Sequence, residues 1–311
     1  MDLPLHVYDR LFPRFQPSRE LRPKGDGRGA AVRLSWLGTA GYILETPGTT
    51  LLIDPFITRH GLRGILGGRL APDEAAIRRH LPARVDAILC GHSHYDHAVD
   101  APRIATITGG KLVGSPSTLA WGRAEGLPEE RLVEVPPEGR SLQVGDVEVR
   151  FVPSLHGRLA FNRVLLPGEV HGVPRAPGRI WDYKMGGAFG LLLRVPGVSL
   201  YHNGSADLID AELAGERADV LLVGLSGRQG TPGYVPRLLS ALRPKLVVPT
   251  HHDAFFAPLE RGFHLLPGVD LEGFVAEVGR EAPEARVISP DYEEPICIPP
   301  DDARGAVLAP R

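Results

Sequence analysis

Cysteine is scarce in this chain, which has only Cys90 and Cys297 among its 311 residues. Two cysteines cannot build the disulfide framework of a small secreted domain, and a chain of this length can bury a large core without one. Cys90 ends an apolar run, and we expect it to be a small buried residue and not a metal ligand. This cysteine usage favours a cytoplasmic setting.

Long apolar runs and charge of one sign are also missing. No apolar run approaches the roughly 20 residues that a membrane-crossing helix needs. Residues 1–6 lack the basic and apolar segments of a signal peptide, so we expect neither a signal peptide nor a transmembrane segment. The net charge is −2 without a basic run, which gives no reason to expect a nucleic acid partner. The oligomeric state stays open, and a homo-oligomer is compatible with these features.

What the chain does have, from residue 31 onward, is a series of short apolar runs that alternate with helical patterns. This alternation predicts an α/β protein with helices over the faces of its sheets, although periodicity does not separate one sheet from two. Residues 1–30, rich in Pro, predict an irregular arm, and 289–311, rich in Pro and acid, a loosely ordered tail. We expect strands over 32–37, 42–45, 50–54, 85–90, 112–114, 147–152, 188–195, 198–201, 220–223 and 246–248, and helices over 72–81, 115–125, 208–214 and 235–242.

The segment 91–97 is the most informative part of the chain. It holds His92, His94, Asp96 and His97 directly after the predicted strand 85–90. Alternate residues of an extended segment point the same way, so His92 and His94 can share one ion. The chain then begins a helix, where Asp96 and His97 can face a second ion. Imidazole and carboxylate ligands suit borderline metal ions such as zinc, whereas solvated histidines would not need this spacing.

Three later apolar runs also end on candidate ligands. They lead to His156, to the segment 202–207, and to His251, which His252 follows directly. One loop cannot complete two tetrahedral sites, so we expect these strand ends to converge on segment 91–97.

This series resembles the metallo-β-lactamase superfamily, whose members carry HxHxDH, then a lone His, an Asp and a final His. Segments 36–45 (WLGTAGYILE) and 52–55 (LIDP) are similar to the branch that contains L-ascorbate-6-phosphate lactonase and N-acyl-phosphatidylethanolamine phospholipase D. The resemblance covers about residues 32–288. It implies an αββα sandwich of two mixed sheets flanked by helices, a hydrolase domain over 31–288, and metals at one edge between the sheets.

The resemblance also implies two divalent metal ions, with zinc favoured and manganese or iron as alternatives. It implies that Asp54 is a supporting residue and not a ligand. The implied ligands are His92, His94 and His156 for the first ion, Asp96, His97 and His251 for the second, and Asp207 as a bridge.

The bridging segment departs from the family pattern. Members usually have Gly-Asp-Thr, whereas this chain reads Gly204-Ser205-Ala206-Asp207. Strict alignment places Ser205 at the carboxylate, but a neutral hydroxyl is a poor bridge between two dications. A local shift of two residues would bring in Asp207, which we favour. If neither residue bridges, the second site would be weaker and a one-metal enzyme becomes an alternative.

Residues 157–187 break the strand pattern just after His156. A long irregular loop beside a ligand is typical of a lid or binding wall, with a self-packed surface loop as the alternative. Its apolar content favours a small-molecule or lipid-like substrate with an apolar portion. We predict substrate contacts from His171, Trp181 and Tyr183 in this loop. Arg228, in a Gly-rich turn, is a candidate clamp for phosphate or carboxylate, with a solvated arginine as the alternative.

These features predict a metal-dependent hydrolase. A hydroxide bridging the two ions would attack a carbonyl carbon or a phosphorus, and so cleave an ester, a lactone or a phosphodiester. We predict catalytic roles for Asp96 and for His252, a candidate proton donor that is otherwise a buried neutral histidine. The departure at Ser205 leaves a catalytically reduced metal-binding scaffold or sensor as an alternative. An iron-binding redox protein is a third interpretation, which the lack of an attached flavin-binding domain disfavours.

Overall fold

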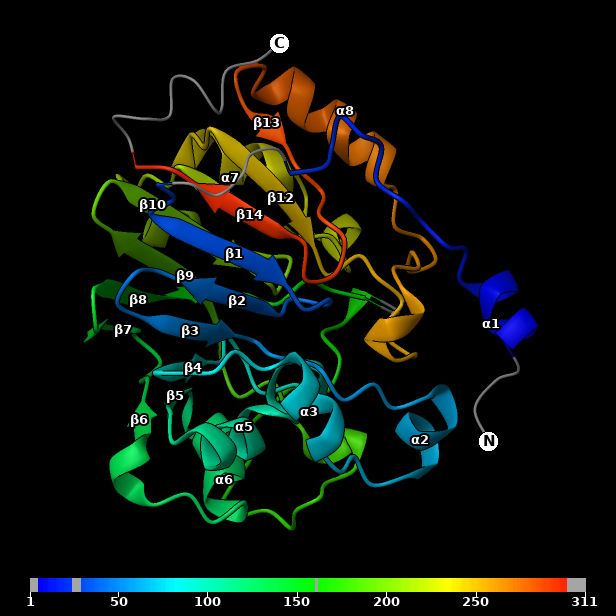
Figure 1. Cartoon of the computed structure of the whole chain (residues 1–311), viewed down its shortest axis with the longest axis vertical. Coiled ribbons are helices and arrows are strands. Elements are labelled where there is room, and N and C mark those ends of the chain that lie inside the picture. Colours follow the sequence, from blue (N-terminus) through cyan, green and yellow to red (C-terminus); the bar gives the residue numbers. More distant parts are fainter. Residues whose placement is uncertain (1–4, 24–28, 160–161, 301–311) are drawn as a thin grey trace.

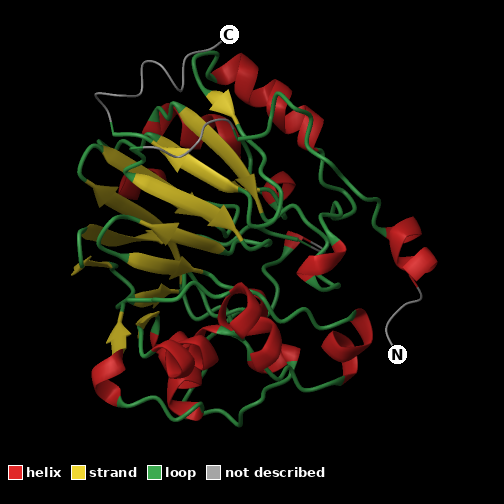
Figure 2. Cartoon of the chain, in the orientation of Figure 1, coloured by secondary structure: helices red, strands yellow, loops and turns green. Residues whose placement is uncertain are grey.

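The computed structural model describes residues 5–23, 29–159 and 162–300. Within them, two seven-stranded mixed sheets lie face to face between helices (Figures 1 and 2). The first sheet has the order β14 (Pro295–Ile298), β1 (Val32–Trp36), β2 (Tyr42–Glu45), β3 (Thr50–Ile53), β4 (Ala87–Leu89), β5 (Lys111–Gly114) and β6 (Leu132–Glu134). The second has the order β13 (Arg286–Val287), β12 (Leu246–Thr250), β11 (Val220–Gly224), β10 (Val198–Asn203), β9 (Ala188–Val195), β8 (Val147–Ser154) and β7 (Arg140–Val144).

Each sheet has a parallel half and an antiparallel half. In the first sheet, the pairings from β3 to β6 are parallel. In the second sheet, the pairings from β10 to β13 are parallel. Because parallel strands end at the same edge of a sheet, the residues that follow β3 and β4 are neighbours, as are those that follow β10, β11 and β12. The predicted αββα sandwich is therefore confirmed, and its parallel strands position the candidate site.

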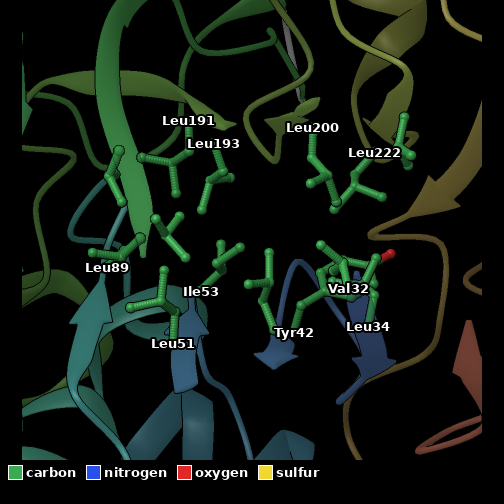
Figure 3. Packing of buried hydrophobic residues seen from close by; sticks show 14 of the residues in the cluster. Val32, Leu34, Tyr42, Leu51, Ile53, Leu89, Leu191, Leu193, Leu200 and Leu222 are labelled. Carbon is green, nitrogen blue, oxygen red and sulfur yellow. The ribbon is translucent and has the colours of Figure 1, made fainter. Parts of the chain in front are cut away.

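The core lies between the two sheets, and a second apolar layer lies outside each sheet. Leu191 and Leu193 of β9 point into the space between the sheets, where they join residues such as Leu51 and Leu89 (Figure 3). Leu192, between them in sequence, belongs instead to the outer layer. This period of two is the expected pattern of a strand that is buried on both faces.

Helices cover both outer faces. On the first sheet they are α3 (Glu74–His80), α5 (Ala101–Thr108) and α6 (Pro116–Ala124), whose apolar residues pack with those of β2 to β5. On the second sheet they are α7 (Tyr234–Leu242) and α8 (Leu271–Glu281). No helix in the described ranges is long and apolar enough to cross a membrane. The remaining elements are α1 (Leu5–Leu11), α2 (Leu62–Gly67), α4 (Tyr95–Ala98) and the 3-10 turns Glu129–Arg131, Ile180–Asp182, Asp210–Leu213, Arg228–Gly230 and Leu259–Arg261.

Three segments differ from the expectations. The N-terminal arm contains helix α1, and Tyr8 and Phe12 of the arm are buried against the loop after β12. The helix expected over 208–214 is only a 3-10 turn over Asp210–Leu213, after which Ala214 is extended and Gly215 has a φ of 81°. The tail expected to be loose forms β14, which pairs antiparallel with β1; its residues 301–311 lie outside the described part.

Candidate metal centre

Six of the predicted ligands lie together where the strands end. Segment 91–97 follows β4 and runs into α4, whereas the other two ligands follow β8 and β12 of the second sheet. They form two groups, and within each group one potential ligand atom of every residue lies within 4.8 Å of the others. The first group is His92, His94 and His156, and the second group is Asp96, His97 and His251.

The first group consists of three neutral imidazoles. The rings of His92, His94 and His156 stand at 74–85° to one another, with centroids 4.7–4.9 Å apart. Burial and the neighbouring imidazoles lower the pKa of His92 well below its usual value, and burial lowers the pKa of His94 to about 3. His156 Nδ1 lies 2.8 Å from the carbonyl oxygen of Gly157, to which it can donate its proton, so that Nε2 keeps a lone pair.

The second group contains the carboxylate. His251 Nε2 lies 3.1 Å from Asp96 Oδ2, and His97 Nε2 lies 3.8 Å from the same oxygen. Burial alone would raise the pKa of Asp96, but the adjacent His97 and His251 lower that pKa overall. Asp96 is therefore ionised at neutral pH and can act as an anionic ligand.

Asp54 supports the second group from outside it. Its Oδ2 lies 3.0 Å from His97 Nδ1, and its Oδ1 accepts a hydrogen bond of 2.7 Å from the backbone of Gly91. Burial opposes protonation of His97, but Asp54 and Asp96 raise the pKa of His97 overall. A carboxylate on the far nitrogen of a histidine fixes the ring and directs Nε2 toward a metal. Gly91 is needed here because a Cβ would lie 3.0 Å from the carbonyl oxygen of Phe189.

The backbone around the site is strained. Thr39, Asp54, Ala206 and His251 have φ values of 51°, 42°, 56° and 51°, in the left-handed region that non-glycine residues rarely occupy. Such conformations persist only where the surroundings hold them in place. For His251 the support is Thr39, whose carbonyl oxygen accepts hydrogen bonds from the His251 backbone (2.7 Å), the Thr250 hydroxyl (2.7 Å) and the Trp36 indole (3.0 Å).

A buried charged cluster in turn holds Thr39. Asp253 accepts hydrogen bonds from the Thr39 backbone (2.7 Å) and the Tyr292 hydroxyl (2.8 Å), and it lies 3.3 Å from Arg59. The side chains of Arg59 and Asp253 are 1% and 0% exposed. We call Thr39, Arg59, Asp253 and Tyr292 the Asp253 network. This network holds in place the start of the loop that carries His251. The spacing of the candidate ligands did not predict the network.

The structure does not bring Asp207 to either group. Its Oδ1 accepts a hydrogen bond from the backbone of Leu208, and its carbonyl oxygen is held by Ser154 and Asn203. The left-handed Ala206 turns the chain before Asp207 and forms a bridge with His156. Ser205 instead faces the site, with its hydroxyl donating to the carbonyl oxygen of Leu155 at 2.9 Å. The prediction of Asp207 as the bridge is thus not supported by this geometry.

A cavity of about 330 Å³ opens beside the two groups, and His94, Asp96, His156 and His251 form part of its lining. Much of the rest is apolar. The irregular loop supplies part of this wall, as expected of a binding wall, but α2 and the segment after His251 were not anticipated as site elements. The spacing of the α2 residues at i, i+3 and i+4 is the signal that could have indicated an amphipathic helix. The principal wall residues are Leu62, Ile65 and Leu66 of α2, Leu165 and Leu166 of the loop, and Phe255 and Phe256 after β12.

The four residues predicted to touch substrate lie elsewhere. His171 is exposed and does not line this cavity. Trp181 is also exposed, under the guanidinium of Arg179. Tyr183 is buried in a stack on Trp121, with centroids 4.0 Å apart. Arg228 forms an ion pair with Glu277 at 2.5 Å, so its charge is already matched. None of these four residues lines this cavity, and their contacts with a substrate stay predictions.

His252 also points away from the cavity. Its ring stacks on Trp36, with centroids 4.8 Å apart and an interplanar angle of 7°, and it meets Phe263 edge-on. Burial lowers the pKa of His252 to about 4, so it is neutral at pH 7. The geometry matches the alternative of a buried neutral histidine and not the predicted proton donor.

The donor set fits two divalent ions. His92 Nε2 and His94 Nε2 are buried and have no hydrogen-bond partner among the described residues, which is costly unless something else binds them. Three imidazoles form a known zinc-ligand set, and two imidazoles with one carboxylate suit zinc or iron. The metal-ligand assignments themselves stay predictions, and the convergence of six donors is the observation behind them.

Comparisons with known proteins point the same way. A profile of the β-lactamase superfamily domain matches residues 33–251. A UPF0173 metal-dependent hydrolase from Pyrobaculum arsenaticum is 30% identical over 230 residues, which cover 72% of this chain and 85% of that protein. Its counterpart from Anaeromyxobacter sp. strain K is 31% identical over 234 residues, with coverage of 72% and 76%. The structure of Igni18, a metallo hydrolase from Ignicoccus hospitalis, shares the fold, with a TM-score of 0.51, 17% identity and coverage of 85% and 97%.

Proposed function

This chain belongs to the metallo-β-lactamase superfamily and, within it, to the UPF0173 family of metal-dependent hydrolases, and from that premise we propose that it uses two divalent ions, preferably zinc, to hydrolyse an ester, a lactone or a phosphodiester. The convergence of His92, His94 and His156 beside Asp96, His97 and His251 carries the proposal. Bound ions would lower the pKa of a shared water toward neutrality and polarise the bond to be cleaved.

Each side chain of the site has a definite task in this proposal. The first group holds one ion and the second group holds the other. Asp54 keeps His97 oriented, and the Asp253 network keeps His251 in its strained conformation through Thr39. Asp96 belongs to the second group and also lines the cavity, so it would hold an ion while staying beside the reacting water, which is the catalytic position predicted for it.

Ser205 gives the second candidate function its support. It lies at the cavity where the family pattern has a carboxylate, and a hydroxyl cannot neutralise the charge of two ions. A protein that binds metal without turnover, as a scaffold or sensor, would be compatible with this substitution. Activity measurements on metal-loaded protein separate the two candidates.

The test compares metal-stripped and reconstituted protein on three substrates: 4-nitrophenyl acetate, a simple aliphatic lactone and bis(4-nitrophenyl) phosphate. We expect hydrolysis of at least one substrate, its loss on stripping with chelator, and its return with zinc or manganese. The His94→Ala variant should be inactive, whereas the control His80→Gln, on α3 and away from the cavity, should retain activity. Protein that is fully metal-loaded but inert on all three substrates would contradict the hydrolase and favour the scaffold.

A further inference from the structure

The wall of the cavity is mainly apolar, whereas the part beside the ligand groups carries His94, Asp96, His156 and His251. Ile65, Leu166 and Phe255 are among its lining residues, and they come from α2, the irregular loop and the segment after β12. No lysine or arginine is among the described residues that line it. Among the described lining residues, the charged or titratable groups are Tyr95 and the ligand candidates themselves. Three separate parts of the chain thus present an apolar surface to one space beside the ligand groups.

The mouth of this cavity exposes large apolar side chains to water. Leu66 of α2 is 72% exposed, and Leu165 of the loop is 45% exposed. Leu159, also in the lining, is 38% exposed. Most large apolar side chains among the described residues are covered, so a group of exposed leucines at one opening marks a surface that an apolar ligand would cover.

Contacts with the N-terminal arm also hold one part of the cavity wall in place. Phe256, which lines the cavity, packs against Phe12 of the N-terminal arm, with ring centroids 5.5 Å apart. The Tyr8 hydroxyl donates a hydrogen bond of 2.8 Å to the carbonyl oxygen of Ala254. The N-terminal arm therefore packs against the segment that supplies Phe256 to the wall.

A phosphate-bearing substrate fits these features poorly. Protein sites for phosphate diesters generally supply a cation or a cluster of backbone N–H groups beside the phosphate. Arg228, the candidate clamp in the Gly-rich turn, is paired with Glu277 and is not in the lining. Arg59 is also committed, to Asp253 inside the protein. Apart from bound metal, the described lining therefore has no side chain that would neutralise a phosphate or headgroup.

We propose that the substrate is an ester or lactone with an uncharged aliphatic chain, and that this chain occupies the cavity between α2 and the irregular loop. The proposal rests on the proposed hydrolase function. The carbonyl group would lie beside His94, Asp96 and His156, while the chain extends past Ile65 and Leu166 toward the exposed leucines. Water hydrolyses the acyl–oxygen bond, so that the acyl carbon gains the hydroxyl and the leaving alcohol gains the proton.

The test is the dependence of kcat/KM on chain length for 4-nitrophenyl acetate, butyrate, hexanoate and octanoate, with metal-loaded protein and monomeric substrate. Each methylene that enters the cavity should raise kcat/KM about fourfold until the cavity is full. The variants Ile65→Asn and Leu166→Asn should flatten this dependence, measured within each variant as the ratio of kcat/KM for octanoate to kcat/KM for acetate. Leu11→Asn, a control at an exposed leucine of α1 outside the cavity, should keep the full dependence.

Binding of decanoate, measured by calorimetry, gives a second readout, and Ile65→Asn should weaken it about tenfold or more. Metal-dependent acetate hydrolysis without any gain from longer chains would overturn the chain-binding cavity and leave the hydrolase intact. Cleavage of bis(4-nitrophenyl) phosphate without cleavage of any ester would overturn the ester class. Inactivity on every substrate despite full metal loading would instead contradict the proposed function. Circular dichroism melts of each variant exclude misfolding as the cause.

Discussion

The two ligand groups differ in what holds them. The first group is tied to the irregular loop through Ser93, which lies between His92 and His94. The Ser93 backbone N–H donates a hydrogen bond of 2.9 Å to the carbonyl oxygen of Met185, and the Ser93 hydroxyl donates one of 2.5 Å to the carbonyl oxygen of Lys184. The second group is tied to the protein interior, through Asp54 and through the Asp253 network. One ligand group is thus coupled to the wall of the cavity, and the other to the buried scaffold.

The two groups also differ in charge. Three neutral imidazoles form the first group, which matches a common zinc-ligand set. The second group adds the ionised Asp96, and two histidines with one carboxylate also serve iron in other proteins. Since Ser205 gives neither group a shared carboxylate, we expect the two ions to bind with different affinities, the second more weakly.

Removing one ligand from each group gives the largest effect. We expect His94→Ala and His251→Ala each to lower the bound metal from two ions per chain to one. Activity should fall by more than about 10- to 100-fold, which is the usual cost of removing a residue that only supports a metal ligand. Metal content by mass spectrometry and kcat/KM on one ester test this. If either variant kept two ions, its histidine would not be a ligand, and the division into two groups would fail.

Breaking the Asp253 network should give the next largest effect. Arg59→Met removes one partner of a buried ion pair and leaves Asp253 uncompensated, which costs about 3–5 kcal/mol of unfolding free energy. Urea unfolding of the metal-free protein measures this. The matched control is Arg123→Met, which removes the exposed ion pair with Glu129 and should change stability much less. Equal losses in both variants would mean that the network is no more important than a surface pair.

A smaller and more selective effect should follow from Asp54→Asn. The amide removes the negative charge that lies 3.0 Å from His97 Nδ1, so the ion in the second group should bind about 10- to 100-fold more weakly. The ion in the first group should keep its affinity, because Asp54 touches none of its side chains. Titration with a competing chelator resolves the two affinities, and a parallel weakening of both ions would argue against independent support of the two groups.

The convergence of the candidate ligands could be predicted from the sequence because their segments follow strand ends. A strand of known direction delivers the next residues to a definite edge of the sheet, so His92, His156 and His251 could be expected to meet. Asp207 was favoured only through a local shift of two residues relative to the family pattern, and the left-handed conformation of Ala206 turns the chain instead. Backbone turns of this kind leave no clear pattern in residue type or spacing.

The substrate cavity was harder to predict than the ligands. Helix α2 is short and contains Gly64 and Gly67, so its apolar face was not recognised. Tyr183 and Trp181 lie in the expected loop, but one is buried against Trp121 and the other is exposed. The short edge strands were not predicted for a related reason: β7 contains only exposed and half-buried residues, and β14 begins at Pro295 in a segment rich in acid. In each case tertiary contacts, and not local propensity, decide the outcome.

The presence of two ions in two separate ligand groups is measured most directly by anomalous X-ray diffraction at the zinc edge from crystals of the zinc-loaded protein. We predict two peaks about 3.5–4 Å apart. One should lie about 2.0–2.1 Å from the ring nitrogens of His92, His94 and His156, and the other should be bound by Asp96, His97 and His251. A correctly folded crystal with no ion at these side chains, or with ions only elsewhere on the protein, would contradict the assignment.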